Sequence, residues 1–211
     1  MVNGNGEDAH AAAAAIRSLK ADLRKQVLAQ RDALGAAERK KLSERITARL
    51  LGLDAYREAG CVMAYVGFGS EIDTARFVAD TLSQGKTLVL PSVERGNRAL
   101  KLYDVRDPEN QLETGVWGIR QPRADLCPEI SAAQIEFVLV PGVAFTRRCE
   151  RLGYGGGFYD GFIRSLVPRP ALVAAAFALQ VLAELPMSET DQRVDLVMTE
   201  DADYRVPGGK K

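Results

Sequence analysis

Residues Arg151 to Asp160 combine the side chains and the backbone that phosphate chemistry requires. Their sequence is RLGYGGGFYD, in which three consecutive glycines, Gly155 to Gly157, lie between an arginine and a carboxylate. A glycine-rich turn before a helix exposes backbone N–H groups that bind anions, and guanidinium groups suit phosphate. Asp160 would repel a phosphate unless a cation lay between them, which indicates a shared Mg²⁺ ion. The segment therefore favours binding of a nucleotide together with Mg²⁺.

The two common phosphate-binding fingerprints do not match this segment. A P-loop needs Lys followed by Ser or Thr after its glycines, and neither pair follows here. The dinucleotide pattern G-x-G-x-x-G begins at Gly153 and Gly155 but has Phe158 at its third glycine position. A structural glycine turn beside surface arginines would give the same sequence. The extra cations Arg147 and Arg148 favour anion binding over that alternative.

Histidine chemistry is excluded from the expected folded part of the chain. The single histidine is His10, in an N-terminal leader that we expect to be flexible. A Ser-His-Asp triad, a Cys-His pair or a histidine metal cluster would need a histidine in the folded part. Proton transfer would therefore fall to carboxylates, lysine, tyrosine or the substrate.

The composition indicates one globular domain. The chain has 211 residues, of which 46% are hydrophobic, and its 28 basic residues balance 28 acidic ones, so no net field attracts nucleic acid or an anionic membrane. Three cysteines are too few for a disulfide framework. No apolar segment approaches the roughly 20 residues of a membrane span, and the N-terminus lacks a secretory signal. We expect a cytoplasmic monomer, with a short organellar presequence as the alternative.

Strand and helix patterns alternate after the first fifty residues. Strands are expected at 61–68, 87–93, 100–105, 136–145, 171–178 and 194–200, and helices at 73–85 and 159–167. Of the strands, 61–68 and 136–145 are expected to be buried and 100–105 to be more exposed. This alternation is typical of a mainly parallel sheet with helices on both faces. We therefore predict a single-domain three-layer α/β/α fold. The domain covers residues 12–205, between a flexible leader, 1–11, and a flexible tail, 206–211.

The domain is expected to begin with N-terminal helices between about Ala12 and Leu51. Their apolar stripe consists of Ile16, Leu19, Leu23 and Val27. Lys20, Arg24 and Arg31 lie within about 40° of one another beside that stripe. A basic pair at i and i+4 is usually a solvated helix face. Ligands of open α/β sheets bind at the carboxyl ends of the strands, so the loops after 61–68, 136–145 and 171–178 are the candidate site.

Several segments resemble the 5-formyltetrahydrofolate cyclo-ligases, also called methenyltetrahydrofolate synthetases. The segment VPGVAFTRRCERLGYGGGFYDGFI, residues 140–163, is similar to the signature of that family. The likeness continues in KADLRKQVLAQR near the N-terminus, in SEIDT, in GVWGIRQP and in ETDQRVDLVMTE. The segments follow one another in the family's order, which a chance likeness would not produce.

The resemblance implies an ATP- and Mg²⁺-dependent ring closure in folate one-carbon metabolism. The formyl oxygen of 5-formyltetrahydrofolate would attack the γ-phosphate of ATP and give an iminium phosphate. N10 would then attack that carbon, and loss of phosphate would leave 5,10-methenyltetrahydrofolate and ADP. Phosphoryl transfer depends on positioning and charge stabilisation, so it needs no histidine.

The resemblance also implies roles for particular residues. The expected ATP-binding residues are Lys20, Arg24, Arg151, Leu152, Gly153, Tyr154, Gly155, Gly156, Gly157, Phe158 and Tyr159. The expected folate contacts are Val66, Glu71, Trp117, Tyr154, Gly155, Gly156, Gly157 and Phe158. Arg151, Tyr159 and Asp160 are expected to act in catalysis, and Asp160 and Asp191 are expected to hold Mg²⁺.

Four positions depart from the family pattern. Thr146 replaces the usual Asp, Cys149 the usual Gly, Thr190 the usual His and Gln121 the usual Glu. If the turn at Cys149 has a positive φ, its side chain costs about 1 kcal/mol. The Cys149 thiol would be reactive if nearby arginines lowered its pKa, and inert if it were only a drifted loop residue.

Two other functions stay open on the sequence alone. The four departures are consistent with a non-catalytic relative that binds folate or a nucleotide. A phosphate-sugar isomerase or a CoA-transferase-like enzyme could use a similar scaffold, because fold does not fix function. Substrate-dependent consumption of ATP separates the cyclo-ligase from both.

Overall fold

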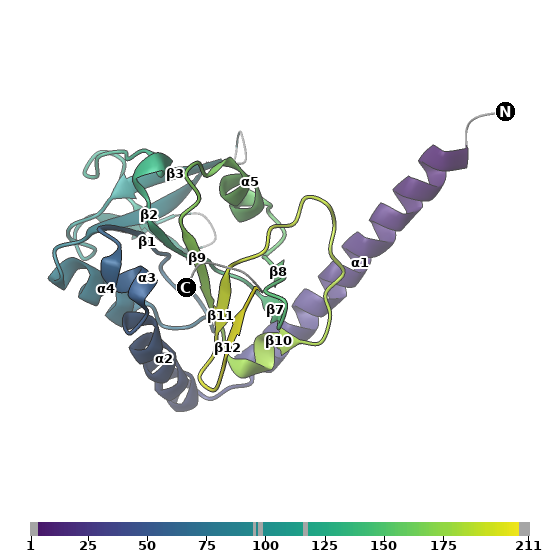
Figure 1. The fold of residues 1–211 in the computed structure, drawn as a ribbon, viewed down its shortest axis with the longest axis horizontal. Helices are drawn as coiled ribbons and strands as arrows, with labels where there is room; N and C mark the ends of the chain where they lie inside the picture. The colour runs from purple at the N-terminus through teal and green to yellow at the C-terminus, as the bar shows by residue number, and fades with distance from the viewer. Residues whose placement is uncertain (1–3, 95, 97–98, 116–117, 207–211) are drawn as a thin grey trace.

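A mostly parallel sheet forms the centre of the molecule. The computed structural model describes residues 4–94, 96, 99–115 and 118–206. Within these residues the main sheet has seven strands in the order β12-β11-β9-β6-β1-β2-β3 (Figure 1). Their bounds are β1 Cys61–Met63, β2 Thr87–Glu94, β3 Ala99–Asp104, β6 Phe137–Leu139, β9 Ala171–Ala175, β11 Leu196–Met198 and β12 Asp203–Arg205. The inner strands pair parallel, whereas the edge strands β3 and β12 pair antiparallel.

Helices cover both faces of this sheet, because successive side chains of each strand point to opposite faces. On β1, Val62 packs into one core and Met63 into the other. The first core lies under α2 (Ala36–Leu51), α3 (Asp54–Glu58) and α4 (Ala75–Ser83), and the second under α5 (Phe158–Ser165). Figure 1 shows these helices on opposite sides of the sheet. The predicted three-layer α/β/α fold is confirmed.

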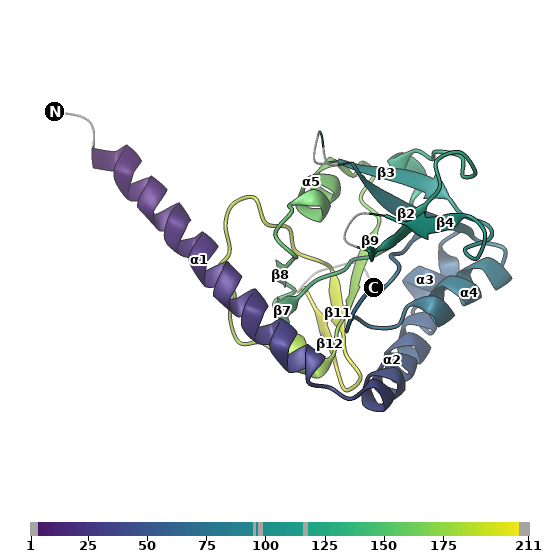
Figure 2. The ribbon, with the colours of Figure 1, turned by 180° about the vertical axis from the view of Figure 1, so that it is seen from behind.

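The long N-terminal helix α1 (Gly4–Asp32) lies beside a smaller sheet. That sheet has the order β10-β7-β8, with β7 at Ala144–Thr146, β8 at Arg151–Leu152 and β10 at Val181–Leu182. Val27 of α1 packs with Leu152 and Leu185 in a third, small core. The first half of α1 extends away from the rest of the molecule in both views (Figure 1, Figure 2).

The remaining elements are short. A two-stranded sheet pairs β4 (Leu112–Thr114) with β5 (Arg120–Pro122). Among the described residues, the 3-10 helices η2 (Ala132–Gln134) and η3 (Ala178–Gln180) connect strands. Strands as short as β8 and β10 have two residues each, which is too short for any period to appear in the sequence.

Some boundaries differ from the sequence expectations. The expected strand 136–145 divides into β6 and β7 at Pro141 and Gly142. Pro141 has no N–H to donate to a neighbouring strand. A Cβ on Gly142 would lie 2.4 Å from the Phe145 ring, so the chain packs tightly against itself at this break. The leader expected to be flexible over 1–11 is helical from Gly4. It adjoins the alanine run 11–15, and alanine has the highest helix propensity of the amino acids. Leu19, expected on the apolar stripe, is 54% exposed, whereas the neighbouring Lys20 is buried, so Leu19 lies on the solvent side of α1.

Candidate functional site

The glycine turn between β8 and α5 has a backbone that other residues adopt with strain. Gly155 has a φ of 102° and Gly157 a φ of 74°, both in the region that favours glycine. A Cβ on Gly156 would lie 2.6 Å from the Phe158 ring. Gly157 is the N-cap of α5, so the turn leads directly into the first amides of a helix, which have no partner inside it.

Arg151 and Asp160 join the two ends of this turn. Arg151 is buried, and its Nη2 donates to Asp160 Oδ1 at 2.6 Å while Nη1 donates to the Pro141 carbonyl at 3.3 Å. The backbone N–H of Gln192 donates to the same Asp160 oxygen at 3.0 Å. In the described part of the chain, Arg151 Nε and the Tyr159 hydroxyl are buried without a hydrogen-bond partner. Orphaned buried polar atoms of this kind need an explanation, and a bound ligand or an ordered water would supply the missing partner.

Lys20 brings a cation from α1 to the loop that follows β10. Its Nζ lies 2.5 Å from Asp191 Oδ2 and 3.2 Å from Ser188 Oγ. The Ser188 N–H also donates to Asp191 Oδ2, at 2.6 Å. Burial raises the pKa of Asp191, but the hydrogen bonds from Lys20 and Ser188 outweigh it and leave the pKa below its usual value. Asp191 is therefore an ionised carboxylate at neutral pH.

Arg24, one helical turn further along α1, lies against the glycine turn. Its Nε donates to the Gly153 carbonyl at 2.7 Å, and its guanidinium carbon lies 3.4 Å from where a Cβ on Gly155 would be. Burial lowers the pKa of Arg24, while the charges of Asp191 and Asp160 oppose that shift. Both carboxylates therefore act on this guanidinium electrostatically, and α1 brings Arg24 to the glycine turn and Lys20 to Asp191.

Glu71 lies in a second, tyrosine-lined part of the site. Its Oε1 accepts from the Tyr154 hydroxyl at 2.5 Å, and its Oε2 accepts from the Phe68 N–H at 3.1 Å. Burial raises the pKa of Glu71, whereas those hydrogen bonds and the charge of Arg31 oppose the rise. Burial and the charge of Glu71 also raise the pKa of Tyr159, with Arg151 opposing. Tyr159 is thus a neutral hydroxyl that interacts electrostatically with Glu71 in one part of the site and with Arg151 in the other.

The loop that carries Glu71 begins where β1 ends. Val66 is partly buried against the first core, and the next residue, Gly67, donates its N–H to Thr74 Oγ1 at 3.1 Å. A Cβ on Gly67 would lie 2.4 Å from the Ile72 carbonyl oxygen, so this loop folds tightly back on itself. Trp117, the other expected folate contact, lies outside the described residues.

The structure thus brings the expected site residues together from four parts of the chain. These are α1, the loop after β1, the segment from β8 into α5, and the loop after β10. Each of those segments contains a charged side chain. No group of three or more His, Cys, Asp or Glu side chains within the described ranges could hold a metal by itself. The charges of Asp160 and Asp191 both act on Arg24, so these two carboxylates lie on the same side of the site.

Some site residues were missed from the sequence. Arg31 contacts Tyr154 and Ser70, and Ser188 and the Gln192 backbone hold the two aspartates. Of these only Arg31 had a signal, since it lies on the same helix stripe as the other α1 cations. The Gln192 contact comes from the backbone and spans 32 positions, so it leaves no local pattern.

Two of the family departures lie in the hairpin between β7 and β8. Cys149 has a φ of 61°, and its N–H donates to the Thr146 carbonyl at 2.9 Å, as in a type I turn followed by a left-handed residue. Thr146 Oγ1 accepts the Arg148 N–H and donates to Glu150 Oε2 at 2.8 Å, where an aspartate would repel that carboxylate. The Cys149 thiol is buried and burial raises its pKa, which favours the inert thiol over a reactive thiolate.

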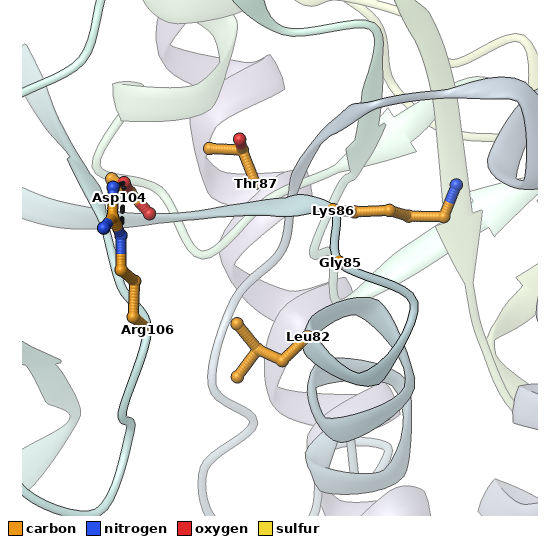
Figure 3. A pocket seen from close by; sticks show the side chains of 6 residues that line it. All are labelled: Leu82, Gly85, Lys86, Thr87, Asp104 and Arg106. Atoms are coloured by element: carbon orange, nitrogen blue, oxygen red, sulfur yellow. Dashed lines mark hydrogen bonds and ion pairs between the residues drawn. The ribbon is translucent and has the colours of Figure 1, made fainter.

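A separate shallow hollow of about 340 Å³ lies at the amino end of β2. Leu82, Gly85, Lys86, Thr87, Asp104 and Arg106 line it. Figure 3 shows Asp104 and Arg106 paired with each other, and Lys86 pointing away from them. Ligands of this fold bind at the other ends of the strands, so we place no chemistry here.

The fold and the site define an α/β protein in which basic side chains and aspartates gather around a glycine turn. The chain belongs to the 5-formyltetrahydrofolate cyclo-ligase family, whose model matches residues 16–200. The prediction of an enzyme of this ligase class is therefore confirmed. In the described part of the chain, none of the helices has the length and apolarity of a membrane span.

Individual relatives agree with this assignment. The NMR structure of the 5,10-methenyltetrahydrofolate synthetase of Aquifex aeolicus is 33% identical, covers 92% of this chain and 95% of its own, and has a TM-score of 0.77. The Mycoplasma pneumoniae synthetase, at 22% identity, 86% and 98% coverage and a TM-score of 0.70, shows the shared fold alone. The mouse 5-formyltetrahydrofolate cyclo-ligase is 27% identical over 199 residues, which are 90% of this chain and 98% of the mouse protein. The Escherichia coli K12 enzyme is 25% identical, covering 81% and 94%.

Proposed function

We propose that this enzyme closes the ring of 5-formyltetrahydrofolate to give 5,10-methenyltetrahydrofolate, and that ATP and Mg²⁺ drive the reaction. One observation carries the proposal. Arg24 and Arg151 contact the glycine turn and Asp160, Lys20 pairs with Asp191, and a separate half-buried carboxylate, Glu71, accepts a hydrogen bond from Tyr154 of the same turn. This arrangement suits a triphosphate on one side and an N–H-rich ring on the other.

The glycine turn is the proposed triphosphate site. Residues 151–159, with Lys20 and Arg24, would hold the phosphates through backbone N–H groups and cationic side chains. Tyr159 and Arg151 have buried polar atoms that lack an acceptor within the described residues, and phosphate oxygens would supply one. Such preorganised donors stabilise the charge that develops on a transferred phosphoryl group.

Asp160 and Asp191 are the proposed Mg²⁺ ligands. Two carboxylates fit an ion that completes its shell with water and phosphate oxygens. When bound, Mg²⁺ would neutralise charge on the phosphates. Lys20 and Arg151, which pair with these aspartates in the structure, would be free to contact phosphate oxygens once the carboxylates have that other partner.

The folate would lie between the glycine turn and the Glu71 loop. Glu71 would accept hydrogen bonds from N–H groups of the pterin-like ring, with Val66, Trp117, Tyr154 and Phe158 around it. The formyl oxygen would then face the γ-phosphate and displace ADP. N10 would attack the resulting iminium phosphate carbon and lose its proton, and inorganic phosphate would leave. We also propose that the enzyme acts as a monomer in a cytosol-like compartment.

A test of the proposal measures ADP release from Mg·ATP with and without 5-formyltetrahydrofolate. The proposal predicts release only with the folate, in equal amounts with methenyl product. Binding of both ligands without ADP release would favour the non-catalytic relative. ADP release that is independent of the folate would contradict the proposed substrate.

A further inference from the structure

Arg31 is a buried cation on α1 without a direct counter-charge among the described residues. It is 3% exposed and lies two helical turns beyond Arg24. Its Nε donates to Ser70 Oγ at 3.0 Å, and Nη1 and Nη2 each donate to the Tyr154 hydroxyl at 3.1 Å. Burial of a guanidinium is costly unless its donors are satisfied. Here the neutral hydroxyl groups of Ser70 and Tyr154 accept the hydrogen bonds of Arg31. Each hydroxyl in turn donates to a carboxylate, Asp32 or Glu71.

The first of these connections determines where the Tyr154 proton points. A phenol oxygen accepts through its lone pairs and has one proton to donate. Two N–H groups of Arg31 occupy the accepting side, so the Tyr154 proton is directed to Glu71 Oε1, 2.5 Å away. The other Glu71 oxygen accepts the Phe68 N–H. Both oxygens of Glu71 are therefore held as acceptors.

The second connection anchors Arg31 itself. Ser70 Oγ, which accepts from Arg31 Nε, donates to Asp32 Oδ1. Ser70 directly precedes Glu71 in the loop after β1, so Arg31 contacts this loop and the glycine turn at once. One side chain of α1 thus contacts both segments that hold Glu71, the loop after β1 and the glycine turn.

We propose that Arg31 is a positioning residue for the reduced folate, which acts by keeping Glu71 an acceptor-only carboxylate through Tyr154. The inference rests on the proposed function and deepens it. The class of ligand is a heterocycle that presents N–H donors. A protonated Glu71 would present an O–H donor to those N–H groups and bind them poorly.

The protonation of Glu71 depends on groups from three segments, which are α1, the loop after β1, and the segment from β8 into α5. Burial is the largest influence and raises the pKa of Glu71, whereas Tyr154, the Phe68 N–H and Arg31 oppose it. Tyr65 and Tyr159 also interact electrostatically with Glu71, whose charge raises the pKa of both tyrosines. Loss of Arg31 removes a positive charge and frees Tyr154 to rotate, so the pKa of Glu71 should rise further. As the pH falls, the variant should then lose folate affinity at a higher pH than the unchanged protein, because Glu71 is protonated sooner.

The test compares Arg31→Met with Lys25→Met, which removes an exposed cation of the same helix. Affinities for 5-formyltetrahydrofolate and for ATP are measured separately by calorimetry across pH 5 to 9, which spans roughly two pH units either side of neutral. Arg31→Met should weaken folate binding about tenfold, the scale of hydrogen bonds to a charged group, and leave ATP affinity within about threefold. As the pH is lowered, Arg31→Met should begin to lose folate affinity at a higher pH than the unchanged protein does. Lys25→Met should match the unchanged protein.

A double-mutant cycle with Glu71→Gln separates positioning from a general structural role. A glutamine side chain does not titrate, so Arg31→Met should cost little further folate affinity in the Glu71→Gln background. Tyr154→Phe, which leaves Arg31 in place, should reproduce the folate defect and serves if Arg31→Met does not fold. An equal effect of Arg31→Met in both backgrounds, an unmoved pH profile, or full folate affinity in Tyr154→Phe would overturn the inference.

The same data distinguish this inference from the proposed function. Absence of folate binding by the unchanged protein, or an unaffected Glu71→Gln variant, would overturn the folate site and the role of Arg31 together. Strong folate loss in Glu71→Gln with normal binding in Arg31→Met would overturn the role of Arg31 alone.

Discussion

Asp160 serves the fold as well as the proposed chemistry. It supplies the countercharge for Arg151, whose side chain is 2% exposed, and it also accepts the Gln192 N–H. Removal of one member of a buried ion pair leaves an uncompensated charge. A change at Asp160 therefore affects stability and catalysis, although the sequence motif alone indicates only catalysis.

Asp160→Asn should lower kcat at least about 100-fold, the scale of losing one preorganised charge contact. It should also lower the melting temperature by several degrees, about 2–4 °C for each kcal/mol in a chain of this size. Steady-state kinetics and a thermal melt measure the two effects. Asp125→Asn, at an exposed ion pair with Arg123, is the matched control and should change neither. A near-normal rate in Asp160→Asn would remove it from the proposed metal site.

Cys149 should be inert toward thiol reagents in the native protein. Its side chain is fully buried, its pKa is raised, and its Sγ lies 3.1 Å from the Tyr204 carbonyl oxygen. Alkylation by iodoacetamide, followed by peptide mass spectrometry, should modify Cys149 quickly only in denaturant. Rapid native modification at neutral pH would show that the thiol is accessible and ionised.

At the scale of elements, α1 is the part that completes the site. Lys20 pairs with Asp191, and Arg24 donates to the glycine turn. Arg31 donates to Tyr154, the tyrosine that holds Glu71. The helical spacing of these cations was visible in the sequence. Their partners were not, because those lie more than a hundred residues away for all but one of the contacts.

Lys20→Met should raise the KM for ATP about tenfold or more, because it removes a charged donor from the proposed phosphate site. It should also lower the melting temperature, since Asp191 loses its ion pair. Initial rates over a range of ATP concentrations measure the first effect. Lys25→Met on the exposed side of the helix should leave the KM unchanged. The same ATP dependence in both variants would argue against contact between α1 and ATP.

The β7–β8 hairpin gives a pH-dependent prediction. Glu150 is buried, and although burial raises its pKa, hydrogen bonds from Thr146 and Arg148 and the charge of Arg193 leave the pKa below its ordinary value of 4.5. A depressed carboxyl pKa stabilises the fold above the unfolded value and loses that effect as pH falls through the folded one. Because Arg148 and Arg193 are more than half exposed, screening limits the gain.

Glu150→Gln should therefore reduce the free energy of unfolding by about 1–2 kcal/mol at pH 7. The deficit should shrink as the pH falls from the ordinary value of 4.5 through the lower folded-state pKa of Glu150, below which both proteins are uncharged at this position. Urea unfolding at pH 7 and at lower pH measures it, with the exposed Glu113→Gln as control. A deficit that stays constant with pH would mean that the Glu150 charge contributes nothing.

At the scale of the whole molecule, periodicity predicted the three layers and most inner strands. It could not predict the break at Pro141 and Gly142 as two strands in different sheets, because both halves are buried and apolar. The site residues were predicted by motif, whereas the pairing of Lys20 with Asp191 and of Tyr154 with Glu71 depends on how the layers pack. Tertiary contacts of this kind have no local sequence signal.

The most direct test of the central claim follows the near-ultraviolet absorbance of 5,10-methenyltetrahydrofolate. The purified protein is mixed with 5-formyltetrahydrofolate and Mg·ATP. We predict a rise that requires ATP and Mg²⁺ and that Asp160→Asn abolishes. A flat trace from protein shown to be folded by circular dichroism, or a rise that persists without ATP, would contradict the proposed reaction.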